Sequence, residues 1–411
     1  MAIVDKRGTD GFPAAINDIP SAALTQGGNE VHMYPGTYTA PTDVVASDYA
    51  YIGQGDAEEI IINGDMSIAQ RATSASVSDG SNEGYSTVDR WYVLHSSSAG
   101  GVATWSQDSD VPTDYSWGRF SKSLKADVTT ADTSIASNHA ITLQYRIEAQ
   151  DIRNSGWDYT NPNSTLSVSF WAKSVKAGTY CVALHTHDGT VADIVKEYTL
   201  VANTWKHVEL EFPGNSGLTI DDNNGAGLTV LWALQVGSDR QLDAGTTWTT
   251  RSGEGKYGSS NQVNFYDSTD NNFYLTGVQI EVGKATTFEH RSFGEELALC
   301  QRYFQLHNNI MTAGYVPDNT ARVYALGFNY PVQMRDAPTL SITQTGSTSH
   351  QAVVDASQGA NITSILSSSI TKFCAEYSVN LDADLTNFRP AITESPASST
   401  RATDYKFNAE I

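Results

Sequence analysis

The chain has few cysteines and no long apolar run. Its 411 residues include three cysteines, Cys181, Cys300 and Cys374, which lie far apart and outside any CxxC spacing. An odd number of widely spaced cysteines argues against a disulfide framework. No apolar stretch reaches the length of a membrane-spanning helix. The N-terminus lacks a basic segment followed by an apolar run, so we expect synthesis in a cytoplasm without export by the general secretory route.

Positive charge is also scarce. There are 25 Lys and Arg residues against 46 Asp and Glu residues, a formal net charge of -21. Nucleic acids and anionic membranes repel such a chain on average, because binding to them depends on cations that neutralise phosphate. We therefore expect no nucleic-acid binding and no membrane insertion. The acidic excess leaves room for calcium, which takes oxygen ligands, although no particular site follows and we predict no cofactor.

Motifs that carry enzymatic chemistry are missing. The sequence has no GxSxG, no HExxH, no P-loop, and no GxGxxG that follows a strand and opens a helix. His185, His187 and Asp188 are the nearest approach to a metal cluster, but two ligands on one strand face do not make a zinc site. The acidic stretch Asp221–Asn224 before Gly225 is more typical of a turn with Asx hydrogen bonds than of a calcium loop. We predict that the chain is not an enzyme and holds no metal.

Short strands and turns dominate what the chain does contain. The 32 glycines and the many Ser, Thr and Asn residues indicate frequent turns. Apolar and polar residues alternate along successive segments, which is the pattern of half-buried strands. The pattern predicts an all-β fold whose main domain, residues 61–291, is a jelly-roll β-sandwich of two packed antiparallel sheets. The predicted inward faces are Ile141–Ile147, Leu166–Phe170, Tyr180–Leu184, Val208–Phe212 and Leu228–Val236 at every second residue, and Tyr274, Thr276, Val278, Ile280 and Val282.

Three further segments flank the sandwich. Residues 1–60 are polar and turn-rich, and we predict a small N-terminal attachment or oligomerisation module. Around Ser292 the period changes, because Phe293, Leu297, Cys300 and Phe304 recur at helical spacing. Ser292 and Glu295 form a capping-box pattern, which predicts a linking helix within 292–309. Residues 310–411 return to strand patterns and predict a smaller C-terminal β domain.

Several phrases of the sequence occur in a recognisable order: Asn63–Arg71, Val88–Trp91, Ser169–Ser174, Ala202–Pro213, Phe273–Gly283, Phe288–Arg291, Gly294–Tyr303, Pro331–Thr339 and Asn408–Ile411. Together they resemble one family over roughly residues 60–411. That family comprises bacteriophage tail-fibre and minor tail proteins with a jelly-roll domain like a carbohydrate-binding module and a C-terminal β domain. The resemblance implies a virion structural protein in a phage tail or other external appendage, assembled as a homotrimer. Residues 1–60 lie outside the resemblance, and we expect them to attach the chain to other virion proteins. No sugar-contacting residue is carried over from the family.

Aromatic residues in loops are the candidates for ligand contact. Sugars are held by aromatic faces together with polar side chains, and loops carry such groups more often than core strands do. Trp171, Trp205 and Trp232 fall within strand patterns, and we expect them in the core. The candidates for ligand binding are Tyr115, Trp117, Trp157, Tyr159, Trp248 and Tyr257, the last two in the long polar segment 237–272. Packing against a neighbouring subunit is the main competing interpretation.

These observations predict a tail-fibre or appendage tip that binds a host-surface receptor, a glycan or a protein, without catalysis. Repetition of weak sites in a homotrimer raises the overall avidity. One alternative is a capsid decoration or head-fibre protein with a purely architectural role. Another is a polysaccharide depolymerase, which needs two carboxylates opposed across a cleft.

Overall fold

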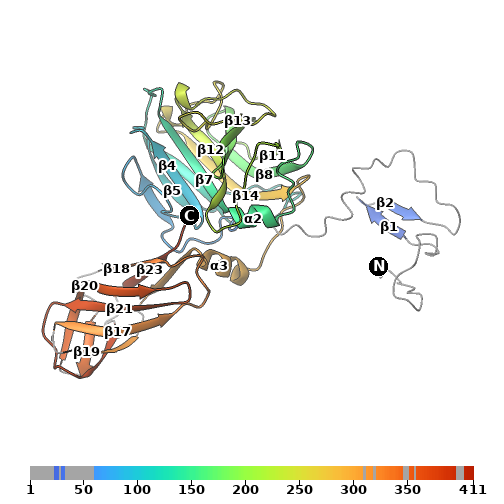
Figure 1. Cartoon of the computed structure of the whole chain (residues 1–411). Coiled ribbons are helices and arrows are strands. Elements are labelled where there is room, and N and C mark those ends of the chain that lie inside the picture. The colour runs from blue at the N-terminus through green and yellow to red at the C-terminus, as the bar shows by residue number, and fades with distance from the viewer. Residues whose placement is uncertain are drawn as a thin grey trace, which may run out of the picture. The chain divides into compact units, whose positions relative to one another are not determined.

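The computed structural model describes residues 60–308, 312–317, 321–345, 351–355, 358–394 and 402–411, and two strands nearer the N-terminus. These strands, β1 (Ala23–Gln26) and β2 (Asn29–His32), pair antiparallel. Residues 1–56 and 57–411 form separate units. The rest of the predicted attachment module lies outside the described residues. Figure 1 shows the whole chain.

The larger domain is a sandwich of two six-stranded sheets, which confirms the predicted all-β jelly roll (Figure 1). We call them the β12 sheet and the β8 sheet. The β12 sheet has the order β13-β10-β9-β12-β7-β4, with β4 (Trp91–Ser96), β7 (Ala140–Glu148), β9 (Gly178–Thr186), β10 (Ala192–Leu200), β12 (Ala226–Val236) and β13 (Thr249–Thr250). The β8 sheet has the order β11-β8-β14-β6-β5-β3, with β3 (Ser74–Val77), β5 (Val102–Asp108), β6 (Ser123–Thr130), β8 (Thr165–Ser174), β11 (Lys206–Pro213) and β14 (Asn272–Val282).

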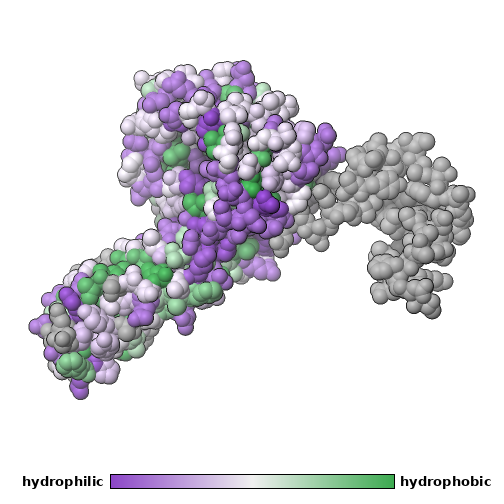
Figure 2. Space-filling view, in the orientation of Figure 1, coloured by the Kyte–Doolittle hydropathy of each residue, from purple (hydrophilic) through white to green (hydrophobic). Residues whose placement is uncertain are grey.

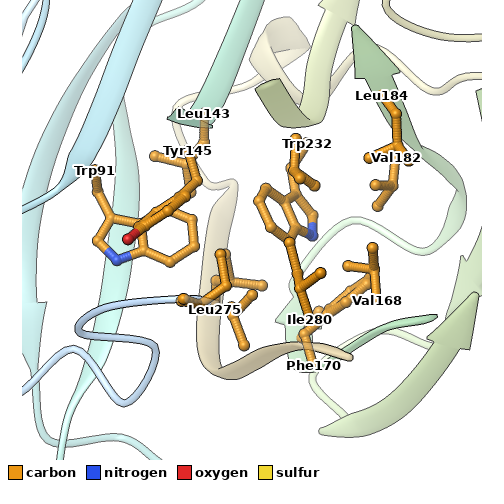
Figure 3. Close-up of a cluster of buried hydrophobic side chains, with 14 of the residues drawn as sticks. Trp91, Leu143, Tyr145, Val168, Phe170, Val182, Leu184, Trp232, Leu275 and Ile280 are labelled. Carbon is orange, nitrogen blue, oxygen red and sulfur yellow. The ribbon is translucent and has the colours of Figure 1, made fainter. Parts of the chain in front are cut away.

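Apolar side chains from the two inner faces form one core, as Figure 3 shows. Trp232 lies at its centre, with its ring 5.4 Å from that of Trp91 and 5.5 Å from that of Phe170. The alternation predicted for β7, β8 and β9, and for β12 as far as Leu234, is confirmed, because alternate residues of each strand enter this core together. The prediction is wrong for Val236, since the register of β12 shifts after Ala233 and Val236 joins a separate cluster with Tyr257. Burial of this apolar surface is the main force that holds the sheets together.

Strand β14 departs from the predicted alternation. The register with β8 shifts between Thr276 and Gln279, and Gly277 adopts a left-handed φ of 60°. Phe273 and Leu275 therefore face the core before the shift, and Val278 and Ile280 face it afterwards. The prediction that Tyr274 and Thr276 share the inward face is wrong, because a β-bulge changes the parity of the strand.

Two short helices accompany the sandwich. Helix α3 (Phe293–Gln301) begins at the predicted capping box, in which both Ser292 and Glu295 make their reciprocal hydrogen bonds. It is shorter than predicted: Phe304 already belongs to a strand, and Phe293 is 65% exposed. Helix α2 (Ala149–Asn154) was not predicted, because its six residues are too few to show a helical period. No helix among the described residues is long and apolar enough to cross a membrane.

The C-terminal region forms the predicted smaller β domain, with a three-stranded sheet beside a closed barrel. The sheet has the order β15-β23-β18, with β15 (Phe304–Asn308), β18 (Thr339–Thr345) and β23 (Ala402–Asn408). The hydrophobic core of the C-terminal domain includes Leu326, Tyr377 and Phe407. The barrel has the order β16-β17-β21-β20-β19-β22, with β16 (Thr312–Tyr315), β17 (Arg322–Asn329), β19 (Gln351–Asp355), β20 (Gln358–Ile370), β21 (Cys374–Leu381) and β22 (Pro390–Glu394).

Candidate ligand-binding face

Three of the aromatic residues predicted to contact ligand are buried. Trp157, Trp248 and Tyr257 are 3%, 7% and 8% exposed. The indole N–H of Trp157 donates to the carbonyl of Ser164 over 3.2 Å, and that of Trp248 donates to the carbonyl of Pro213 over 2.6 Å. The prediction that these three rings face outward is wrong, because they pack in hydrophobic clusters and both indoles are satisfied by backbone.

Tyr159 is half-buried beside Trp157, with the two ring centres 6.3 Å apart. Its hydroxyl lies 3.5 Å from the guanidinium of Arg153. Tyr159 and Trp157 lie in the loop between α2 and β8, and we assign Tyr159 a packing role.

The long polar segment after β12 is fastened to the outer face of the β12 sheet by Asp193. The buried carboxylate of Asp193 accepts from Nε of Arg251 over 3.0 Å and from the backbone N–H of Lys256 over 3.0 Å. Tyr257 stacks on His185 with ring centres 5.1 Å apart. Burial lowers the pKa of His185 to about 4, so this imidazole is neutral near pH 7. The segment is therefore ordered by its own chain.

The side chains considered as metal ligands have other contacts. Nε2 of His185 lies 2.8 Å from the carbonyl of Lys256, and Nε2 of His187 lies 2.7 Å from the hydroxyl of Thr229. In the described parts of the chain, no three His, Cys, Asp or Glu side chains gather closely enough to hold a metal. Asn223 accepts from the backbone N–H of Gly225 over 2.7 Å, as the predicted Asx turn requires.

The other two predicted aromatic residues lie on the loop 109–122, over the outer face of the β8 sheet. Trp117 stacks on His207 of β11, with ring centres 4.1 Å apart and planes 16° apart. His207 in turn lies 5.3 Å from Trp171 of β8, its direct partner across the strands. Tyr115 is 59% exposed, and the guanidinium of Arg119 lies 5.5 Å from its ring. Trp171 is thus buried, as expected, but beneath this loop and not in the main core.

A second aromatic group crosses the same face. Lys173 of β8 lies directly opposite Tyr274 of β14, which lies opposite Lys125 of β6. Nζ of Lys173 lies 4.3 Å from the centre of the Tyr274 ring and 5.3 Å from the Trp205 ring. The Trp205 and Tyr274 rings are 6.0 Å apart, and the Trp205 indole donates to Asp110 over 3.0 Å.

We call these residues the aromatic face: Trp117, Trp171, Trp205, His207 and Tyr274, with Asp110, Lys125 and Lys173. Of these residues, Trp117 alone was a predicted ligand contact. Trp205 was expected in the core, but it precedes the first residue of β11 and is half-exposed. Tyr274 was assigned to the core face, and the bulge at Gly277 turns it outward. A glycine within an alternating strand is the signal that could have identified the bulge.

Charges on the aromatic face are paired locally. Burial opposes ionisation of Asp110, but hydrogen bonds from Lys173 and Trp205 outweigh it and lower the pKa of this carboxyl. Lys125 pairs with Asp127 over 3.3 Å. Burial lowers the pKa of His207 to about 4, so its stacked ring is uncharged near pH 7. The face therefore combines neutral rings with fixed hydrogen-bonding groups, which suits a ligand with both C–H faces and hydroxyls.

His207 also lines a cavity of about 410 Å³ between β10 and the outermost strand β11. The aromatic face is thus continuous with a hollow at the seam of the two sheets. The other residues that line this cavity are Glu197, Tyr198, Thr199, Lys206, Val208, Glu209 and Leu210.

No family model matches the chain, and no curated protein matches it. Among solved structures, a family 4 carbohydrate-binding module has a TM-score of 0.28 at 12% identity over 54% of this chain and 98% of that chain. The enzymatically active domain of tailspike protein 4 from bacteriophage CBA120 has a TM-score of 0.26 at 14% identity over 50% of this chain and 21% of that chain. The C-terminal family 22 carbohydrate-binding module of Clostridium thermocellum Xyn10B has a TM-score of 0.25 at 15% identity over 48% of this chain and 88% of that chain. Similarity at this level assigns neither a family nor a function.

Proposed function

We propose that this chain is a non-catalytic binding protein of a bacteriophage tail fibre or similar appendage, and that it recognises a glycan on the host surface. The observation that carries the proposal is the aromatic face, where Trp205 and Tyr274 lie 6.0 Å apart on the outside of the β8 sheet. The virion assignment rests on the resemblance of the sequence phrases to phage tail-fibre and minor tail proteins.

The chemistry of the face supports a glycan. Aromatic rings cover the C–H surfaces of a sugar, and the ammonium of Lys173 and the carboxylate of Asp110 reach hydroxyls at the edges of the rings. Lys173 and Tyr274 lie on strands, and Asp110 accepts hydrogen bonds from Lys173 and Trp205, so little side-chain order has to be created on binding. Assembly as a homotrimer would repeat the face and raise the avidity for a polymeric surface.

The test compares adsorption of the parent and of a Trp205→Ala/Tyr274→Ala variant to host cells and to isolated envelope polysaccharide. We expect at least a tenfold weaker association for the variant, with an unchanged thermal unfolding midpoint. Tyr92→Ala is the matched control. Tyr92 lies on the outer face of the β12 sheet. Its ring also lies next to a cation, since the guanidinium of Arg146 is 4.2 Å from the ring centre. The control should bind as the parent does.

Other results distinguish the alternatives. Equal adsorption by the parent and the double variant would falsify the assignment of this face. Release of reducing sugar from host polysaccharide would establish a depolymerase. Electron microscopy of labelled particles that places the chain on the capsid, together with no binding to host cells, would establish the architectural role. A parallel measurement in EDTA tests whether calcium takes part.

A further inference from the structure

The rings of the aromatic face already have a cation of the protein beside them. Nζ of Lys173 lies 4.3 Å from the centre of the Tyr274 ring and 5.3 Å from that of Trp205. A cationic group of a ligand would be drawn to the same ring faces, because these faces attract positive charge. The ammonium of Lys173 would repel it there. The aromatic face is therefore poorly suited to a positively charged ligand.

The cations of the aromatic face are also occupied by carboxylates. The ammonium of Lys173 pairs with Asp110, and that of Lys125 pairs with Asp127 over 3.3 Å. Asp110 is held in this arrangement, because it also accepts from the indole of Trp205 over 3.0 Å. An anionic group of a ligand would have to compete for Lys173 with a carboxylate that is already in place, and like charges brought together oppose binding.

The surroundings of the aromatic face do not favour an anion. Figure 2 shows that hydrophilic residues cover much of one side of the sandwich, and the whole chain has a net charge of -21, which repels an anionic polymer. Carboxylates match the cations in number over the aromatic face with Asp127, the loop 109–122 and the cavity between β10 and β11. The cations are Arg119, Lys122, Lys125, Lys173 and Lys206, and the carboxylates are Asp110, Asp114, Asp127, Glu197 and Glu209.

The surface is long enough for a chain of sugar units. Trp205, His207 and Glu209 follow one another at every second residue, so they share the outer side of the β8 sheet. From Trp205 to Glu209 an extended strand covers about 13 Å, which is longer than one sugar ring. His207 and Glu209 also line the cavity between β10 and β11. The surface therefore continues from the rings into this cavity.

We propose that the ligand is an extended chain of uncharged sugar units, one of which stacks on Trp205 and Tyr274 while a later unit enters the cavity beside His207 and Glu209. This inference rests on the proposed function and adds the class of glycan to it. The side chain of Glu209 is 48% exposed, so its carboxylate can accept hydrogen bonds from sugar hydroxyls. The same carboxylate repels an acidic sugar at this position.

The experiment uses the full chain and polysaccharide from the host envelope. Anion exchange separates this material into an unretained, uncharged fraction and a retained, anionic fraction. Binding of each is measured at about 0.01 M and about 1 M salt, between which the screening length falls from about 30 Å to about 3 Å. At the lower salt concentration we expect the uncharged fraction to bind more tightly by at least about tenfold, because like charges oppose the anionic one. We expect its affinity to be the same at both salt concentrations.

Asp110→Asn tests the charge argument. It frees the ammonium of Lys173 and keeps an oxygen that can accept from the indole, so the affinity for the anionic fraction should rise relative to that for the uncharged fraction by at least about tenfold. Glu254→Gln is the matched control, because Glu254 pairs with Arg240, whose guanidinium lies 5.2 Å from the Tyr257 ring. The control should keep the ratio of the parent. Thermal unfolding midpoints show that each variant is folded.

The outcomes separate this inference from the proposed function. Equal binding of the two fractions, or tighter binding of the anionic one, overturns the inference and leaves glycan recognition in place. An unchanged ratio in folded Asp110→Asn also overturns it, since the paired carboxylate would then not be what excludes anionic chains. Binding of neither fraction defeats the proposed function, and this inference with it.

Discussion

The guanidinium of Arg71 donates a hydrogen bond of 3.1 Å to the carboxylate of Glu410, which lies 339 residues later in the chain. The other oxygen of this carboxylate pairs with Arg90, whose side chain is 1% exposed. All three side chains are at least nine-tenths buried. Burying charges is favourable only when they are paired, so this contact ties the end of the C-terminal domain to the first strands of the sandwich.

Removing the Glu410 charge should destabilise the protein strongly. Glu410→Gln leaves the buried Arg90 without its carboxylate and leaves Arg71 with the carboxylate of Asp89, 3.5 Å away. Breaking such a buried pair typically costs about 3–5 kcal/mol in the free energy of unfolding. Urea unfolding of the parent and the variant measures this change. The control is Glu254→Gln, since the Glu254 side chain also pairs with an arginine, Arg240, but is 55% exposed. Its change should stay below about 1 kcal/mol, and equal effects of the two substitutions would contradict the argument.

Stability should also depend on the ionisation of Asp89. Burial raises the pKa of this carboxyl to about 6, above the value of about 3.9 for an exposed aspartate. The carboxyl of Asp89 therefore binds its proton more tightly in the folded protein than in the unfolded chain. Ionisation of Asp89 lowers the free energy of unfolding as the pH rises from about 4 to about 6. Asp89→Asn removes that titration.

We expect the free energy of unfolding of Asp89→Asn to rise relative to that of the parent over this range, and the difference to level off above about pH 6. Urea unfolding at several pH values measures it. A difference that does not change with pH would show that Asp89 is not the titrating group.

Gly277→Ala should destabilise the sandwich. Gly277 has a left-handed φ of 60°, which costs other residues roughly 1–2 kcal/mol. An added methyl group would also lie 2.5 Å from the ring of Phe120. Gly294→Ala is the control, because Gly294 lies in α3 and nothing is within 4 Å of an added methyl group there. Thermal unfolding compares the two, and a neutral Gly277→Ala would refute the bulge described for β14.

Trp248→Phe should affect stability and leave ligand binding unchanged. The variant keeps an aromatic ring in the core but leaves the carbonyl of Pro213 without the indole donor, which costs about 1–3 kcal/mol. The same adsorption assay that tests Trp205 and Tyr274 measures its binding. Weaker adsorption by a folded Trp248→Phe protein would restore Trp248 as a ligand contact.

The sequence was sufficient to predict the sandwich, because burial of one strand face produces alternation that can be read directly. It was also sufficient for the start of α3, since the capping box is a local pattern. The candidate site was predicted less well. The segment containing Trp248 and Tyr257 was expected to face a partner, but its position depends on the buried pair of Asp193 and Arg251, which are far apart in sequence and carry no local signal.

Residues from four of the sequence phrases that resemble the tail-fibre family make buried polar contacts with one another or with the sandwich. Arg71, Arg90 and Glu410 come from three of them and meet in one buried group. Arg302 belongs to a fourth, and it donates two hydrogen bonds, of 3.0 and 2.9 Å, to the buried carboxylate of Glu148. These four phrases thus describe how the sandwich and the C-terminal domain are joined. Two others, Ala202–Pro213 and Phe273–Gly283, hold Trp205, His207 and Tyr274 of the aromatic face.

Because of the bulge at Gly277, the number of residues in β14, as well as their identity, decides which side chains form the outer surface. Deleting this single residue would restore simple alternation, and the segment before it would exchange its two sides: Tyr274 would turn toward the interior, while Phe273 and Leu275 would become solvent-facing. A single insertion or deletion in β14 would therefore change which side chains form this outer surface. Substitutions that aim to alter what the surface recognises should keep the number of residues in β14.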